Sequence, residues 1–228
     1  MLNGKVKVSF FRTRHQEFLR YFSQEKELVY RNDIVELLKH LGVPEYKSED
    51  WRLFIDSSKK SLKCVLLHNG NQFASVPLAH STTLKEQHEA IKYVLEKISY
   101  DQHKWLICVD LKMVNFLLGQ QSGFTKYPCF LCLWDSRDRT HHYVKKEWPV
   151  REELAICRAK NVINKPLANR GRILFPPLPI KLGLIKQFTK ALDKDGRCFQ
   201  FLCKTFPNLL TETLKAGIFD GPQIRQLI

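Results

Sequence analysis

The sequence predicts an α/β fold in which a mixed sheet has flanking helices and a helical insertion follows. Three observations predict this class. Short runs rich in β-forming residues lie at 51–56, 61–68 and 72–78, and an amphipathic segment follows at 83–98. A further apolar run comes at 104–110. A meander, a crossover helix and a strand parallel to the first make one compact sheet.

Turn residues and side-chain patterns support each element of this sheet. The Asn-Gly-Asn run at 69–71 is typical of a hairpin turn. Pro77 predicts an edge strand at 72–78, because proline has no N–H for a sheet ladder. The weak alternation in 104–110 predicts a strand covered on both faces. One face of the helix at 83–98 carries Leu84, His88, Ile91, Val94, Leu95 and Ile98.

Helices are expected both before and after the core in the sequence. Segments 13–24 and 32–41 read as helices, the second with Asn32 or Asp33 as its N-cap. A short helix at 111–118 ends at Gly119, and helical patterns return at 180–192, 197–205 and 208–216. We therefore expect a helical accessory segment at 1–50, the core at 51–118, and a Cys/His-containing helical insertion at 119–228.

Composition limits the class of protein. With 228 residues and 44% hydrophobic residues, the chain can form a substantial core. No apolar run approaches the ~18 residues of a membrane span, and the N-terminus lacks the apolar stretch of a secretory signal. Seven cysteines at irregular spacings argue against a disulfide framework. These features predict a nuclear or otherwise intracellular protein that does not span a membrane.

The net charge of +14 lies mainly in the second half of the chain. Residues 111–228 carry 20 Lys and Arg against 9 Asp and Glu, which accounts for +11. Such an excess favours DNA as a partner, and the alternative is an ordinary solvated basic surface. The expected phosphate contacts are Lys181, Lys186 and Lys190 along one helical segment. Lys112 is a further candidate that could equally be an exposed lysine.

Two aspartates are the candidate catalytic residues. Asp56 and Asp110 each end an apolar strand, where aspartate is otherwise unfavourable. Side by side on neighbouring strands, their carboxylates would hold Mg²⁺ or Mn²⁺, which can activate a water or a 3′-hydroxyl. The order of three strands, a helix and a strand with a second Asp is that of the ribonuclease H fold. The alternative is two aspartates at strand ends that face solvent.

A CxxC pair is the candidate zinc site. Two thiolates at the spacing of Cys129 and Cys132 can bind one Zn²⁺ from a single turn, although zinc needs four ligands. His141 or His142 could be the third ligand, with His142 preferred, and Cys157 is a weak candidate for the fourth. The alternative is two buried cysteines in an apolar stretch.

Three segments resemble a known family. They are WLICVDLKMVNFLLGQQSGFTKYPCFLCLWDSR at 105–137, ILFPPLPIKLGLIKQFTKAL at 173–192 and AGIFDGPQIR at 216–225. They resemble a group of cut-and-paste DDE transposases that is broadly similar to Transib-type transposases and to the catalytic subunit of the V(D)J recombinase. The resemblance implies a ribonuclease H-like fold in which Asp56 and Asp110 match the first two acidic ligands. It also implies that Cys129 and Cys132 belong to a zinc-binding insertion.

The sequence departs from this family at two places. Pro179 stands where family members carry a His, and the chain stops at Ile228, before any segment that matches the one with the catalytic Glu. We therefore expect a transposase-derived protein, a fragment of a metal-dependent DNA strand-transfer core that binds DNA and is inactive alone. A homodimer is an open question. The alternative is a non-catalytic, zinc-containing module that binds nucleic acid or another protein.

Overall fold

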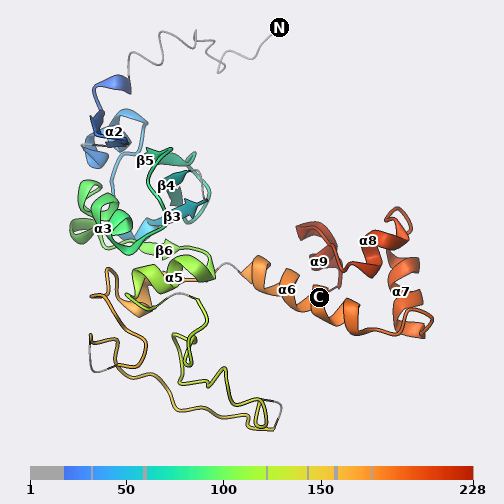
Figure 1. Ribbon diagram of the computed structural model, residues 1–228. Coiled ribbons are helices and arrows are strands. Elements are labelled where there is room, and N and C mark those ends of the chain that lie inside the picture. Colours follow the sequence, from blue (N-terminus) through green and yellow to red (C-terminus); the bar gives the residue numbers. More distant parts are fainter. Residues whose placement is uncertain are drawn as a thin grey trace, which may run out of the picture. The chain divides into compact units, whose positions relative to one another are not determined.

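The computed structural model describes residues 18–31, 33–58, 61–121, 123–142, 144–156, 159–175 and 177–227. The chain divides into two compact units, Met1–Leu174 and Phe175–Ile228. The first unit is a mixed α/β structure and the second is helical (Figure 1). The segment expected as one insertion, 119–228, is therefore divided between the two units.

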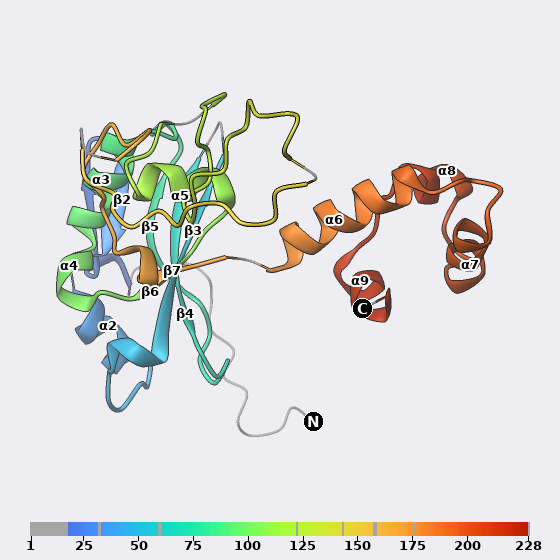
Figure 2. The same ribbon diagram turned by 90° about the horizontal axis from the view of Figure 1, so that it is seen from below.

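A seven-stranded mixed sheet, counted over the described residues, forms the centre of the first unit. Its order is β1-β2-β5-β4-β3-β6-β7. Antiparallel pairs join β1 to β2, β2 to β5, β5 to β4 and β4 to β3, whereas β3, β6 and β7 are parallel. Figure 2 shows the strands with α3, α4 and α5 alongside. The bounds are β1 Phe22–Glu25, β2 Leu28–Arg31, β3 Trp51–Ser57, β4 Leu62–His68, β5 Val76–Ser81, β6 Leu106–Cys108 and β7 Ile173–Leu174.

The two faces of the central strands differ in burial. Trp51, Leu53 and Ile55 of β3 are almost fully buried, whereas the alternate residues of β3 are half-buried. In β6, Ile107 is buried and pairs with Leu53, while its neighbours in β6 are half-buried. The strand expected to be covered on both faces is therefore fully buried on one face and half-buried on the other. Side chains on the half-buried face can therefore be exposed to solvent where the strands end.

Two predictions for the N-terminal half of the chain, a helix at 13–24 and an edge strand with Pro77, are wrong. Residues 22–25 form strand β1 of a hairpin and not the end of a helix at 13–24, and residues 13–17 lie outside the described part. Lys26 in the turn has φ of 54°. The strand with Pro77 is internal, since β5 lies between β4 and β2. Pro77 is tolerated because it follows a register shift and because the pairing of β5 with β2 reaches only to Ala79.

The helices of the first unit include two that start two and five residues later than predicted, one that starts at residue 111 as predicted and one that was not predicted. They are α2 Ile34–His40, α3 His88–Lys97, α4 Tyr100–His103 and α5 Leu111–Leu117, with short 3₁₀ turns at Ser48–Asp50 and Arg170–Arg172. Asp33 caps α2 by accepting a hydrogen bond from the Glu36 amide at 2.8 Å. Gly119 ends α5 with φ of 66°, and a Cβ there would lie 2.0 Å from the Asn164 carbonyl oxygen. This position therefore requires glycine.

The second unit has a small core of its own. Its helices are α6 Pro177–Ala191, α7 Arg197–Thr205, α8 Thr211–Lys215 and α9 Gly221–Leu227. Leu182, Ile185 and Leu192 pack against the buried cluster Phe199, Leu202, Phe206, Leu214, Phe219 and Ile224. Among the described residues, no helix is both long and apolar enough to cross a membrane.

Candidate functional site

The two candidate aspartates lie at the same end of neighbouring parallel strands. β3 and β6 pair in parallel, with Phe54 opposite Cys108. Two residues beyond that pair stand Asp56, still within β3, and Asp110, past the end of β6 at the start of α5, and both residues are exposed. In-register residues of a parallel pair project to the same face. The two predicted carboxylates therefore lie at the C-terminal ends of β3 and β6, and this end of the sheet is called the sheet edge below.

Asp110 also has a structural role that the sequence prediction did not assign. It is the N-cap of α5, and its Oδ1 accepts a hydrogen bond from the Met113 amide at 2.7 Å. An aspartate in this position stabilises the helix by satisfying an otherwise unpaired N–H. The cap leaves the second carboxylate oxygen for another partner. Asp110 therefore suits both the structural and the metal-binding interpretation.

Glu86 is a third carboxylate near this edge, and the sequence prediction gave it no role. Its Oε1 accepts a hydrogen bond from the Ser57 hydroxyl at 2.7 Å, and its Oε2 forms an ion pair with Lys112. Only 11% of the Glu86 side chain is exposed. Lys112 is consequently paired with a carboxylate, which weakens its prediction as a free phosphate contact. No sequence signal marked Glu86, because its partners come from β3 and α5.

The two cysteines of the CxxC pair lie together in a loop organised by Arg151. The Leu131 amide donates to the Cys129 Sγ at 3.3 Å, and Cys132 forms an isolated bridge with Val150. Burial raises the pKa of Cys132, and its hydrogen bond with Cys129 raises it further. Neighbouring thiols of this kind are suitable as two ligands of one metal ion.

Arg151 fixes the backbone around these cysteines. It is 2% exposed, and it donates to three carbonyl oxygens, those of Tyr127 at 3.1 Å, Cys129 at 3.1 Å and Lys160 at 2.6 Å. Burial lowers the pKa of Arg151. A single buried guanidinium therefore replaces regular secondary structure in this segment. Nothing in the sequence around Arg151 predicted this role.

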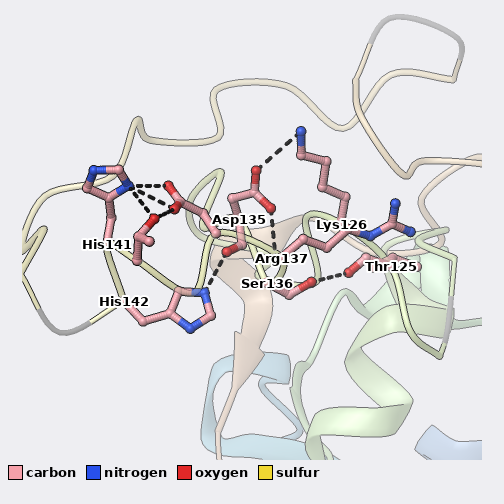
Figure 3. A network of polar contacts seen from close by, with 9 residues as sticks. Thr125, Lys126, Asp135, Ser136, Arg137, His141 and His142 are labelled. Atoms are coloured by element: carbon pink, nitrogen blue, oxygen red, sulfur yellow. Dashed lines mark hydrogen bonds and ion pairs between the residues drawn. The ribbon is translucent and has the colours of Figure 1, made fainter.

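The histidine pair is engaged elsewhere in the same loop (Figure 3). His142 Nε2 lies 2.8 Å from the Asp135 carbonyl oxygen, and His141 Nδ1 lies 2.8 Å from Asp138 Oδ1. Lys126 forms an ion pair with Asp135 at 3.2 Å. The structure therefore does not bring His142 to the cysteine pair, and Cys157 lies outside the described residues.

No group of three or more His, Cys, Asp or Glu side chains suited to a metal ion occurs in the part of the chain that the structure describes. The predicted ligands instead lie in two separate places, the aspartates at the ends of β3 and β6 and the cysteines in the Arg151 loop.

The three lysines of α6 are exposed but do not share one face. Lys186 and Lys190 are four residues apart, which places them about 40° from each other around the helix. Lys181 is nine residues from Lys190 and lies on roughly the opposite side. The structure therefore supports a pair of neighbouring cations and a separate third one.

Comparison with known proteins gives two family matches. A model described as a domain of unknown function, DUF8703, matches residues 10–168. The chain belongs to the DUF8703 family. A second model, the domain of unknown function DUF8704, matches residues 177–228. No curated protein matches the chain.

The family boundaries follow the division of the chain. The DUF8703 match ends at residue 168, shortly before the first unit ends at Leu174, and the DUF8704 match lies within the second unit. The aspartate pair, Glu86 and the cysteine loop all fall in the DUF8703 match. The α6 lysines fall in the DUF8704 match. Each candidate site thus belongs to one of the two domains.

Proposed function

We propose that the DUF8703 domain is a ribonuclease H-like, transposase-derived core that acts on DNA strands, with Asp56 and Asp110 as its metal-binding carboxylates. The observation that supports the proposal is the parallel pairing of β3 with β6, since Asp56 and Asp110 each stand two residues beyond the paired Phe54 and Cys108. The antiparallel meander β3-β4-β5, helix α3 and strand β6 follow in the order expected of that fold.

The donor set at the sheet edge fits a hard divalent cation such as Mg²⁺ or Mn²⁺. Both groups are exposed carboxylates, and the α5 cap uses one oxygen of Asp110. When bound, such an ion would activate an attacking water or 3′-hydroxyl and stabilise the leaving oxygen. Glu86 neutralises Lys112 beside this edge, so Lys112 does not compete for the aspartates.

DNA binding is the second part of the proposal, and the charge distribution supports it. Residues 111–228 hold +11 of the net +14, and Lys186 and Lys190 form a neighbouring pair on α6. Contacts of this kind are made to phosphates and carry no sequence preference. A protein that acts on genomic DNA would work in the nucleus.

A zinc-containing binding module is the alternative function, and the cysteine loop favours it. The amide-to-sulfur hydrogen bond at Cys129 and the buried Arg151 support hold two thiols together in a segment with little regular structure. Two thiols supply half of the four ligands that a structural zinc ion takes. In this alternative, zinc would order the loop, and the loop would contact nucleic acid or a protein.

A combined DNA-binding and strand-cleavage assay in Mg²⁺ and Mn²⁺ tests the proposal. Metal-dependent nicking or strand transfer that Asp110→Asn abolishes would establish an enzyme. Salt-sensitive binding without cleavage would support a DNA-binding core that needs a further ligand. The absence of both DNA binding and cleavage would contradict the proposal and would favour a protein-interaction module.

A further inference from the structure

A groove of about 340 Å³ lies in the second unit, between helices α6 and α7. Its lining includes Ile185 and Phe188 from α6, Cys198 and Phe201 from α7, and Leu227 from α9. Phe188 is 57% exposed and Phe201 is 62% exposed, so both aromatic side chains are accessible to solvent. The groove is therefore open and mostly apolar.

An exposed apolar stripe continues from this groove along α6. Ile180, Leu184 and Phe188 are four residues apart, so they follow one another around the helix in steps of about 40°. Ile180 is 40% exposed and Leu184 is 67% exposed. Leu182 packs against the core of the unit and lies about 160° from Leu184. These three residues and Phe201 are called the apolar face below, and a continuous exposed face of this kind is typical of an interaction site.

Three exposed basic residues flank the apolar face. Arg197 precedes Phe201 by four residues and Lys204 follows it by three, which places both cations beside this side chain on the surface of α7. Lys181 precedes Leu184 by three residues and lies beside the stripe on α6. A partner with acidic side chains around an apolar strip would be complementary to this surface.

The acidic residues of the second unit do not neutralise these cations. Among the described residues of this unit, the one ion pair joins Lys215 to Glu212. Asp193, in the turn before α7, accepts a hydrogen bond from the Asp195 amide at 3.1 Å. Residues 177–228 carry eight Lys and Arg against four Asp and Glu, so their net charge is +4.

We propose that the groove and the apolar face bind an amphipathic helix of a partner protein, one whose apolar side is bordered by acidic residues. Apolar side chains of the partner enter between Phe188 and Phe201, as in other helix-in-groove complexes, and its carboxylates pair with Arg197 and Lys204. Two helical walls make a concave site, which suits a helix better than a membrane surface. A second copy of the chain fits less well, because a twofold contact would bring the same cations together.

The lysines of the proposed DNA contact lie on another side of α6. Lys186 lies about 160° from Leu184 around the helix, and Lys190 lies about 120° from it. The partner site therefore goes beyond the proposed DNA function, and either proposal can fail while the other holds.

A labelled synthetic peptide of about 15 residues, a length at which isolated helices are marginally stable, tests the proposal with the full chain. It carries Leu at helical spacing on one side and Glu on the other sides. The matched peptide has Lys in place of each Glu. Fluorescence anisotropy should show saturable binding of the acidic peptide and at least tenfold weaker binding of the basic one.

Two charge variants locate the site. Arg197→Gln with Lys204→Gln should weaken binding of the acidic peptide at least tenfold. Lys186→Gln with Lys190→Gln removes the same charge from another side of α6 and should leave this binding nearly unchanged. Absent saturable binding, equal binding of the two peptides to the natural chain, or equal losses in the two charge variants would overturn the proposal.

A third variant tests the apolar contact. Phe188→Ser with Phe201→Ser should abolish peptide binding while circular dichroism shows an unchanged helix content, because both side chains are exposed. If this variant does not fold, the charge variants still decide the question. Peptide binding that persists in the folded variant would contradict the proposal. So would self-association, or binding to vesicles of phosphatidylserine and phosphatidylcholine, that this variant abolishes, because the face would then serve a second copy or a membrane.

Discussion

Asp56 and Asp110 each stand two residues beyond the paired Phe54 and Cys108, Asp56 within β3 and Asp110 past the end of β6. Both carboxylates therefore belong to the same edge of the sheet, although 53 residues separate them in the chain. Asp110 additionally caps α5, whereas Asp56 has no such structural role. This difference allows the metal-binding role of the pair to be separated from the stability of the fold.

Substitutions of Asp110 should have different effects on stability. Asparagine caps helices about as well as aspartate, so Asp110→Asn should leave the free energy of unfolding nearly unchanged. Asp110→Ala removes the acceptor for the Met113 amide and should cost about 1 kcal/mol. Denaturant unfolding checks both, and Asp33→Ala on α2 is the matched control for loss of a cap. Equal losses for Asn and Ala would mean that the cap is not what stabilises this position.

Arg151 should be one of the most sensitive positions in the loop with the cysteines. Arg151→Met leaves three carbonyl acceptors without their donor and should cost roughly 2–4 kcal/mol. Arg151→Lys should cost less than Arg151→Met but more than nothing, because one ammonium group cannot reach all three carbonyl oxygens. Arg139→Met, at an exposed arginine of the same loop, should change stability by less than about 0.5 kcal/mol. A loss at Arg151 no greater than that at Arg139 would show that the buried guanidinium does not support the loop.

Zinc content tests the cysteine pair. If the alternative function holds, protein folded with zinc should contain about one equivalent, and the Cys129→Ser, Cys132→Ser double variant should contain none. The Cys198→Ser, Cys203→Ser double variant removes as many thiols from α7 and should retain the metal. Elemental analysis gives the result. Equal zinc in both double variants, or none in the natural chain, would contradict the zinc site.

The helical geometry of α6 makes a specific prediction for DNA binding. Lys186→Gln with Lys190→Gln should reduce the slope of log K against log salt by roughly 2, whereas Lys181→Gln should change it little. Lys26→Gln with Lys39→Gln is a charge-matched control in the first unit. A fluorescence anisotropy titration over a salt series measures the slopes. If the control pair changes the slope as much as the α6 pair, net charge rather than α6 determines binding.

Local patterns predicted the elements whose signals lie close together in the chain. The Asp33 cap, the Gly119 end of α5 and the bounds of α7 follow from neighbouring residues. The strand expected at 72–78 begins only at Val76, so the Asn-Gly turn opens a longer connection than a tight hairpin turn. The β1–β2 hairpin was missed because its turn at Lys26 carries no glycine or asparagine. The strand with Pro77 was wrongly predicted at an edge of the sheet, because only the tertiary pairing shows that β2 pairs with β5 without reaching Pro77.

The candidate sites show the same limit. The parallel neighbours β3 and β6, near whose ends Asp56 and Asp110 stand, could be predicted from the order of the elements alone. Glu86 and Arg151 could not be found in this way. Their roles depend on contacts with residues 9 to 29 positions away, which no local pattern encodes.

Binding of Mn²⁺ tests the central claim most directly. Electron paramagnetic resonance of free Mn²⁺, with the protein added in increasing amounts, counts the bound ions and gives their affinity. The natural chain should bind Mn²⁺ with an affinity that Asp56→Asn and Asp110→Asn each reduce at least tenfold, while both variants remain folded. Undiminished binding in both variants, or no binding by the natural chain, would contradict the assignment of the two aspartates as metal ligands.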